Sequence, residues 1–322
     1  MLSDVDILPS LKIRVLNDSF LCGTKLGTLV PMRGQAMPSE ALSAYNDEVR
    51  RTRRGLLNSD YDPAEMRKML IALDTVGPGP DNRQLGEATL ELRRKEGSAL
   101  LVYVSGGGFC FPGGDANRAL LDRVSEAIDA RGAMLQHRLA PEHPYPAAHE
   151  DVAGALRHIL GEETGPVFVM CDSSAGALVL CACAQMKREG LRLPDKLVCL
   201  SVLTDLAMTG RSNVSNADAD PMFGPQAAMH KIFHYLQGAN PAQASVSPFW
   251  DEAIVLPDTL FIAGSTEVML DDTLRYAKKT ERAGTNAKIS VFEEAPHVFP
   301  LLEGIPEADE AIGEIAAFLR NS

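Results

Sequence analysis

From about residue 88 to the C-terminus, the hydrophobic and polar positions change repeatedly between a strand pattern and a helix pattern. Residues 88–94 (ATLELRR) alternate apolar and polar side chains, and residues 99–104 (ALLVYV) form a continuous apolar run. These two patterns predict an edge strand followed by a strand that is buried on both faces. Further apolar, strand-like runs follow at 133–138, 166–171, 196–203, 258–264 and 287–294.

Helix-like periods separate these runs. They cover 115–132, 147–160, a segment through Met186, 272–283 and a last segment from Pro306. Strands that alternate with helices predict the α/β class, in which a central, mostly parallel sheet has helices on both faces. The polar segment from about 205 to 245, with a helix expected at Pro225–Leu236, interrupts this order. We expect it to lie over the carboxyl edge of the sheet.

The first 60 residues have a different character and predict an accessory layer. They are irregular, with Pro9, Pro31 and Pro38, and they end in an amphipathic helix over about 39–58. A second helix start follows, because Asp62, Pro63 and Glu65 supply a cap, a proline at the first helical position and a capping-box acid. We therefore divide the chain into an N-terminal region, 1–60, and a main domain, 61–322.

Composition excludes several classes of protein. With 43 acidic and 31 basic residues, the net charge is −12, which argues against a nucleic-acid partner. The acidic N-terminus has no secretory-signal pattern and no run of 18 apolar residues occurs, so we expect a cytoplasmic protein without a membrane partner. The six cysteines form no CxxC pair, and the motifs GxGxxG, GxxxxGKS/T and HExxH are absent. We expect no metal site and no cofactor.

A glycine-rich loop is the first candidate for chemistry. The sequence SGGGF (105–109) directly follows the apolar run 99–104. In α/β proteins, ligands bind at the carboxyl ends of the strands. Glycines there let backbone amides approach a ligand, and two adjacent free amides can donate to a developing oxyanion.

The second candidate is an apolar strand that runs into CDSSAG (171–176) and then a helix, the outline of a nucleophile elbow. The sharp turn requires small residues two places on either side of the nucleophile. These are Cys171 and Ala175 for Ser173, but Asp172 and Gly176 for Ser174. Sterics favour Ser173, and Ser174 stays open.

Acids and a histidine complete the pattern. Residues 261–272 contain a strand end followed by acids, and His297 follows the next strand end. The order serine, acid, histidine across three strand ends is that of the α/β-hydrolases. Histidine suits the role of base because its ordinary pKa lets it accept and return a proton near neutrality. The other six histidines lack this placement, and we expect them to be structural.

From residue 88 onward, the chain resembles the hormone-sensitive-lipase-like branch of the α/β-hydrolases, which includes many small bacterial carboxylesterases. The family motif HGGGF corresponds to SGGGF, DYRLAPEHPFPAA to QHRLAPEHPYPAA (136–148), and GDSAGG to CDSSAG. The resemblance implies the α/β-hydrolase fold with a helical lid, formed by the N-terminal region and the insertion at about 205–245. It also implies a small-molecule ester substrate.

Transferred position by position, the resemblance implies a catalytic triad of Ser173, Glu267 and His297, and an oxyanion hole of the amides of Gly107, Gly108 and Ser174. Asp271 is the alternative acid, while Glu293 and Glu294 are expected to face solvent.

The resemblance also implies a substrate pocket and a homodimer. By this resemblance, the dimer interface is expected to be formed by the strand at 287–294 and the helix from Pro306. The long motif 136–148, with Glu142, is expected to brace the oxyanion loop. The apolar pocket is expected to be lined by Phe109, Phe111, Met222, Phe223 and Val298.

Several positions depart from the family. Ser105 replaces a histidine, His137 replaces a tyrosine, and Cys171 and Ala175 replace glycines of the elbow. A displacement of about 1 Å at the nucleophile could cost 100-fold in rate. The main hypothesis is a serine carboxylesterase for short-chain esters. The alternatives are an amidase or formamidase with the same machinery, and a weakly active or non-catalytic small-molecule binder.

Overall fold

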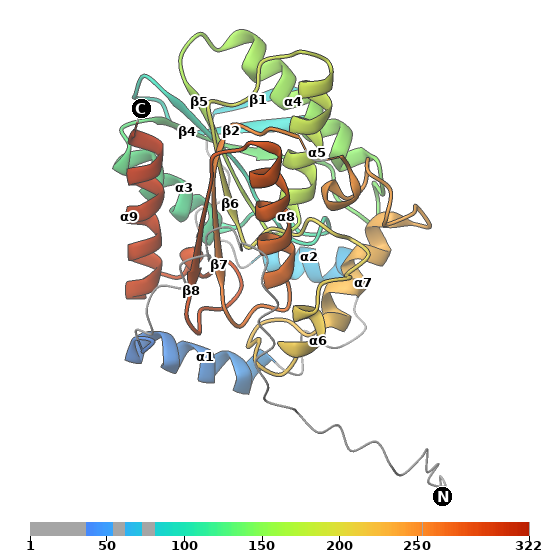
Figure 1. The fold of residues 1–322 in the computed structure, drawn as a ribbon, viewed down its shortest axis with the longest axis vertical. Helices are drawn as coiled ribbons and strands as arrows, with labels where there is room; N and C mark the ends of the chain where they lie inside the picture. The colour runs from blue at the N-terminus through green and yellow to red at the C-terminus, as the bar shows by residue number, and fades with distance from the viewer. Residues whose placement is uncertain (1–36, 54–61, 73–80, 253, 322) are drawn as a thin grey trace, which may run out of the picture. The chain divides into compact units, whose positions relative to one another are not determined.

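The computed structural model describes residues 37–53, 62–72, 81–252 and 254–321 of the chain. The predicted irregular part of the N-terminal region, 1–36, lies outside the described residues, and so does the end of its predicted helix. Figure 1 shows the arrangement of the described helices and strands.

Within the described residues, the strands form one eight-stranded sheet in the order β1-β2-β4-β3-β5-β6-β7-β8. The pairs β1·β2 and β2·β4 are antiparallel, and all other neighbours are parallel. This arrangement confirms the predicted mostly parallel sheet. The strands are β1 Asp81–Leu85, β2 Ala88–Arg94, β3 Leu100–Val104, β4 Arg131–Gln136, β5 Val167–Asp172, β6 Lys196–Leu200, β7 Asp258–Gly264 and β8 Ala287–Phe292.

One strand prediction is wrong. Ala88–Arg94 is a strand with the expected bounds, but it is not at the edge, because β1 pairs along its outer side. Only one of the five β1 residues, Leu85, is buried. An apolar pattern therefore could not reveal this strand, which pairs with β2 along all five of its residues.

Helices cover both faces of the sheet (Figure 1). On one face, α3 and α9 pack with side chains such as Leu121 and Ile315, and on the other, α4, α5 and α8 pack with side chains such as Leu156 and Leu178. The longer helices are α1 Glu40–Arg53, α2 Pro63–Ile71, α3 Asp115–Ala127, α4 Ala147–Glu162, α5 Ala175–Arg188, α7 Pro225–Leu236, α8 Leu270–Ala283 and α9 Pro306–Arg320. Short helical turns are α6 Ser212–Ser215, η1 Pro248–Trp250 and η2 Phe299–Leu301.

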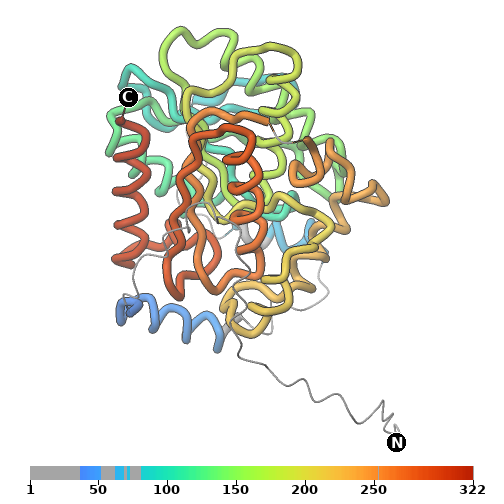
Figure 2. The backbone as a smooth tube through the Cα atoms, in the orientation of Figure 1, coloured from blue at the N-terminus to red at the C-terminus, as the bar shows by residue number. Residues whose placement is uncertain are grey.

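Helix α1 and the part of the β6–β7 insertion that contains α6 lie at the same end of the described structure (Figures 1 and 2). The Asn46 side-chain amide donates to the Glu294 carbonyl at 2.9 Å, and the Arg50 guanidinium donates to the Ala219 carbonyl at 3.2 Å. Thus α1 contacts both the loop after β8 and the insertion. Leu42 is fully buried in the cluster that also holds α3 and α9.

None of the helices in the described ranges has the length and apolar character needed to cross a membrane.

Candidate active site

Three side chains from the carboxyl ends of three strands form one continuous hydrogen-bonded chain. Ser173 follows β5, Glu267 follows β7 and His297 follows β8. The Ser173 hydroxyl lies 2.9 Å from Nε2 of His297, and Nδ1 of the same ring lies 3.0 Å from Oε2 of Glu267. This is the geometry that lets a histidine take a serine proton while an acid holds its ring.

Ser173 occupies a sharp turn between β5 and α5. Its φ of 52° lies in the left-handed region, which an L-residue adopts only under local constraint. Backbone hydrogen bonds supply that constraint, because its N–H donates to the Leu200 carbonyl at 3.0 Å and its carbonyl accepts from the Leu203 N–H at 2.9 Å. The turn therefore presents the hydroxyl toward the cavity above the sheet.

Ser174 points elsewhere. It is 2% exposed, and its hydroxyl accepts a hydrogen bond of 3.3 Å from the N–H of Phe109. The hydroxyl that meets His297 is that of Ser173. Both small neighbours of Ser173, Cys171 and Ala175, are fully buried, so the elbow closes without glycine at either position.

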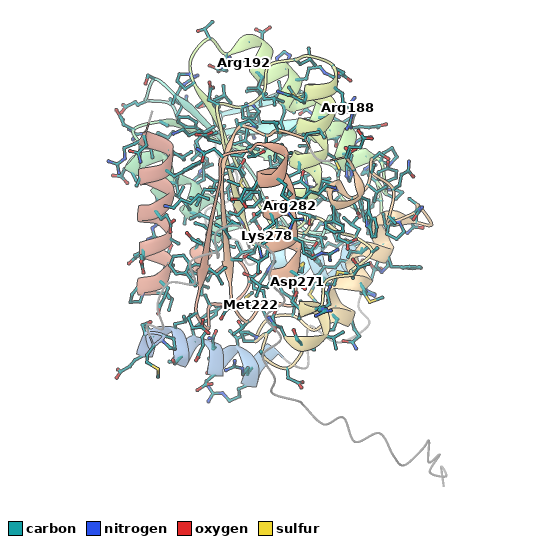
Figure 3. All side chains as sticks on the ribbon, viewed as in Figure 1. Arg188, Arg192, Met222, Asp271, Lys278 and Arg282 are labelled. Atoms are coloured by element: carbon teal, nitrogen blue, oxygen red, sulfur yellow. The ribbon has the colours of Figure 1, made fainter. Side chains whose placement is uncertain are left out.

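The Glu267 carboxylate is fully buried and held on all sides. Its Oε1 accepts from the Ser201 hydroxyl at 2.7 Å and from the N–H of Gly264, while Oε2 faces His297. Asp271, the alternative acid, instead accepts hydrogen bonds from the backbone N–H groups of Arg211 and Ser212. Figure 3 shows Asp271 and Met222 toward the same end of the molecule, far from Arg188 and Arg192.

Glu293 and Glu294 are both exposed. They lie between β8 and His297, and neither side chain is bonded to His297.

The glycine loop is held in place by Asp172. The Asp172 carboxylate accepts from the N–H of Gly106 at 2.9 Å and from the Tyr103 hydroxyl at 2.6 Å. Burial raises the pKa of Asp172, and these two hydrogen bonds oppose the rise. Asn117 donates in turn to the Tyr103 hydroxyl at 3.0 Å. The start of the loop is thus fixed by a buried polar network.

The backbone conformation at Gly107 and Gly108, the next two positions of the loop, requires glycine. Gly107 has a φ of 132° and Gly108 a φ of 62°, both in the region that favours glycine. A Cβ on Gly107 would also lie 2.2 Å from the Phe111 carbonyl oxygen. Within the described part of the chain, the amides of Gly107, Gly108 and Ser174 donate to no other group, and all three residues line the same cavity. They are available to an oxyanion.

The predicted brace of the glycine loop is present, and it includes a residue that the motif does not contain. Arg67 of α2 donates to the carbonyls of Cys110 at 2.8 Å and Ala140 at 2.6 Å, and it pairs with Glu142 at 3.0 Å. The N–H of Ala140 donates to the Phe109 carbonyl at 2.9 Å. The long motif therefore reaches the loop both directly and through Arg67.

A cavity of about 200 Å³ opens beside Ser173 and His297. Of the five predicted pocket residues, Met222, Phe223 and Val298 line it, and the Phe223 ring meets the His297 ring edge-on at 5.0 Å. Phe109 is 1% exposed and stacks on Tyr235, and Phe111 packs beside the loop; neither is among the lining residues. The insertion supplies much of the remaining wall through Ala228, Lys231 and Ile232.

Sequence reasoning missed three residues of this site. Ser201 follows β6 with a φ of 50° and bonds Glu267. Asp220, whose pKa is raised by burial, accepts from the N–H groups of Val268, Met222 and Phe223. Lys231 is buried and lines the cavity. The positive φ of Ser201 has no sequence signal, and Lys231 sits on a helix whose amphipathic pattern alone could not show which face meets the site.

The six other histidines lie away from the chain of hydrogen bonds that links Ser173 to Glu267. His149 is the most buried of those bonded to other side chains; it contacts the Tyr235 hydroxyl at 2.6 Å, and burial lowers its pKa to about 4. In the ranges that the structure describes, no three His, Cys, Asp or Glu side chains are grouped so as to hold a metal ion.

Comparison with known proteins gives consistent matches. The sequence pattern of an alpha/beta hydrolase fold family matches residues 101–301. An acetyl-hydrolase of Streptomyces hygroscopicus is 31% identical over 255 residues, 77% of this chain and 84% of that protein. An esterase of Acinetobacter venetianus is 29% identical over 223 residues, 68% of this chain and 74% of that protein. A solved esterase of the bacterial hormone-sensitive lipase family has a TM-score of 0.78 and 28% identity, covering 88% of this chain and 99% of its own.

Proposed function

The chain belongs to the α/β-hydrolase fold family, in its hormone-sensitive-lipase-like branch, and on that premise we propose that it cleaves small, short-chain carboxylic esters through an acyl-enzyme on Ser173. It is a carboxylic ester hydrolase, and the two relatives described above are named esterase and acetyl-hydrolase. The observation on which the assignment of residues rests is the pair of hydrogen bonds from Ser173 to His297 and from His297 to Glu267.

In this mechanism, Ser173 Oγ attacks the ester carbonyl while Nε2 of His297 takes its proton. Glu267 keeps the other ring nitrogen protonated and stabilises the imidazolium that forms. The tetrahedral oxyanion accepts from the amides of Gly107, Gly108 and Ser174. His297 then gives its proton to the leaving alcohol, and a water molecule, activated by the same ring, releases the acid.

The size of the cavity supports the preference for short esters. Pockets for drug-sized ligands span roughly 300–1,000 Å³, and this cavity has about 200 Å³. Met222, Phe223 and Val298 form part of its wall near Ser173. A short acyl group fits such a space.

We propose that the insertion at about 205–245 acts as a lid. The support is that Met222, Phe223 and Lys231 from this segment line the cavity, and that α1 contacts Ala219 through Arg50.

From the family resemblance, we also propose a homodimer that forms through β8 and α9. Light scattering on a sizing column tests it, and a monomer mass at micromolar concentration would contradict it.

The test of the function is hydrolysis of p-nitrophenyl acetate, butyrate and octanoate. We expect kcat/KM to fall from butyrate to octanoate, and Ser173→Ala and His297→Ala each to lose at least about 10³-fold. Ser174→Ala keeps its backbone amide and serves as the matched control. Activity that survives Ser173→Ala but not Ser174→Ala would reverse the assignment, and wild type without burst or turnover would favour a binding protein.

A further inference from the structure

A buried lysine in the cavity has no role in the mechanism above. Lys231 of α7 is 9% exposed and lines the same cavity as Ser173 and His297. Its stem crosses the glycine loop so closely that a Cβ on Gly108 would lie 2.3 Å from the Lys231 Cδ. The stem of Lys231 therefore lies beside a proposed oxyanion donor.

The surroundings of this ammonium are aromatic rather than acidic. Nζ lies 4.5 Å from the centre of the Phe223 ring and 5.9 Å from that of Phe111. Among the residues that the structure describes, no carboxylate lies within ion-pair distance of Nζ, and no hydrogen-bond acceptor meets it. Burying a charge without a paired anion is costly, and cation–π contacts offset only part of that cost.

Another lysine of this chain, Lys279, has an ammonium group that faces an aromatic ring and also has hydrogen-bond acceptors. Lys279 Nζ lies 5.5 Å from the centre of the Phe249 ring, but it also donates to the carbonyl of Phe249 at 2.6 Å and to that of Asp251. Lys231 has the rings without the acceptors. Lys231 is one of the residues that line the cavity beside Ser173.

We propose that Lys231 binds a carboxylate carried by the substrate, so that this esterase selects esters with a negatively charged acyl or alcohol part. The inference rests on the proposed function and adds the class of substrate to it. A single ammonium balances a single charge, which suits a carboxylate, and a charge-assisted hydrogen bond is among the stronger polar contacts. Because Lys231 and Ser173 line one cavity of about 200 Å³, the carboxylate and the ester carbonyl belong to one small molecule.

The experiment compares charged esters with neutral esters of nearly the same shape. Monoethyl glutarate is compared with ethyl glutaramate, in which an amide replaces the free carboxylate, and this pair tests a carboxylate on the acyl side. The pair 4-acetoxybenzoate and 4-acetoxybenzamide tests a carboxylate on the alcohol side. We expect wild type to favour the carboxylate by at least tenfold in kcat/KM in one pair, and that pair identifies the side. In Lys231→Met, the ratio should fall to within about twofold of unity.

Lys279→Met is the matched control, because it removes an ammonium that faces a ring outside the cavity, and its ratio should equal that of wild type. Lys231→Gln is the second variant if Lys231→Met does not fold. A wild-type ratio of one or less in both pairs would overturn the proposal, as would a wild-type ratio that persists after Lys231 is replaced.

Binding separates this proposal from the proposed function. Calorimetry with Ser173→Ala measures the affinity for all four compounds without turnover. If wild type hydrolyses no ester, including p-nitrophenyl butyrate, but Ser173→Ala binds a carboxylate at least tenfold more tightly than its amide, the function fails and the anion site stands. Equal affinities for the carboxylate and its amide in both pairs would show that Lys231 does not form an anion site.

Discussion

Ser201 donates a hydrogen bond of 2.7 Å to the Glu267 carboxylate from the end of a neighbouring strand. The same hydroxyl accepts from the N–H of Val298 at 3.0 Å, so it joins the acid to the loop that carries His297. Glu267 and His297 are thereby fixed relative to each other by a third side chain. Ser201 is a positioning residue.

Loss of this hydroxyl should lower kcat more than it changes KM. We expect Ser201→Ala to reduce kcat about tenfold, because Glu267 loses one of its three partners and the Val298 amide loses its acceptor. Ser201→Gly is the matched variant, since it removes the same hydroxyl but relieves the φ of 50°. It should melt at a higher temperature than Ser201→Ala while sharing its low kcat. Full kcat in both variants would exclude the positioning role.

The two candidate acids can be separated by amide substitutions. In Glu267→Gln, the side-chain carbonyl is needed by Ser201 and Gly264, so the NH₂ group faces His297 and favours the wrong tautomer. We expect kcat to fall about 10³–10⁴-fold. Asp271→Asn alters only contacts to the 211–212 backbone and should change kcat less than about tenfold. Steady-state kinetics of both variants decide the point, and the reverse order of effects would identify Asp271 as the acid.

Restoring the family's histidine at position 105 should not improve this protein. Ser105 is 4% exposed, and a Cβ on the facing Gly113 would lie 2.4 Å from its Oγ and 1.9 Å from the Met134 Cε. An imidazole has no room there, so Ser105→His should lose about 1–3 kcal/mol of unfolding free energy. Urea titration measures it, with Ser105→Ala as the smaller control. A variant that is more active and no less stable would refute this steric argument.

Stability should depend on pH through Asp272. Burial raises its pKa to about 7, although the N–H groups of Thr204 and Asp205 donate to it. Between about pH 4 and 7, the unfolded chain releases this proton and the folded protein keeps it, so stability falls as the pH rises. The three-unit rise limits the effect to about 4 kcal/mol. Asp272→Asn cannot titrate, so the free energy of unfolding of wild type minus that of the variant should fall from pH 4 to pH 7. A constant difference would contradict the raised pKa.

The preference for charged esters should also depend on pH. Burial lowers the pKa of Lys231 to about 8, and the titratable groups around it are Cys110 beneath its helix and Asp172 and His297 in the cavity. The ammonium is charged below pH 8 and neutral above it. We expect the ratio of kcat/KM for a carboxylate ester to that for its amide to fall about tenfold from pH 7 to pH 9. A ratio that does not change would show that Lys231 does not set it.

Much of the fold was accessible from the sequence because its pattern is periodic. The bounds of α7 and β7 follow directly from their apolar positions, and the order of Ser173, Glu267 and His297 follows the strand ends. The sequence did not reveal β1, since four of its five residues lack a buried side chain. Nor did it reveal Lys231, because a lysine on an amphipathic helix is ordinarily solvated, and only the close approach of α7 to Gly108 buries it.

The contact of Arg67 with the glycine loop has a consequence for how the catalytic rate of this protein can be altered. Arg67 lies outside the matched region 101–301, yet it binds the carbonyls of Cys110 and Ala140, directly after the loop and inside the long motif. The residue that binds these carbonyls therefore lies in a part of the sequence that the family pattern does not cover. Substitutions in α2 are thus a way to adjust the glycine loop without changing any residue of the matched region.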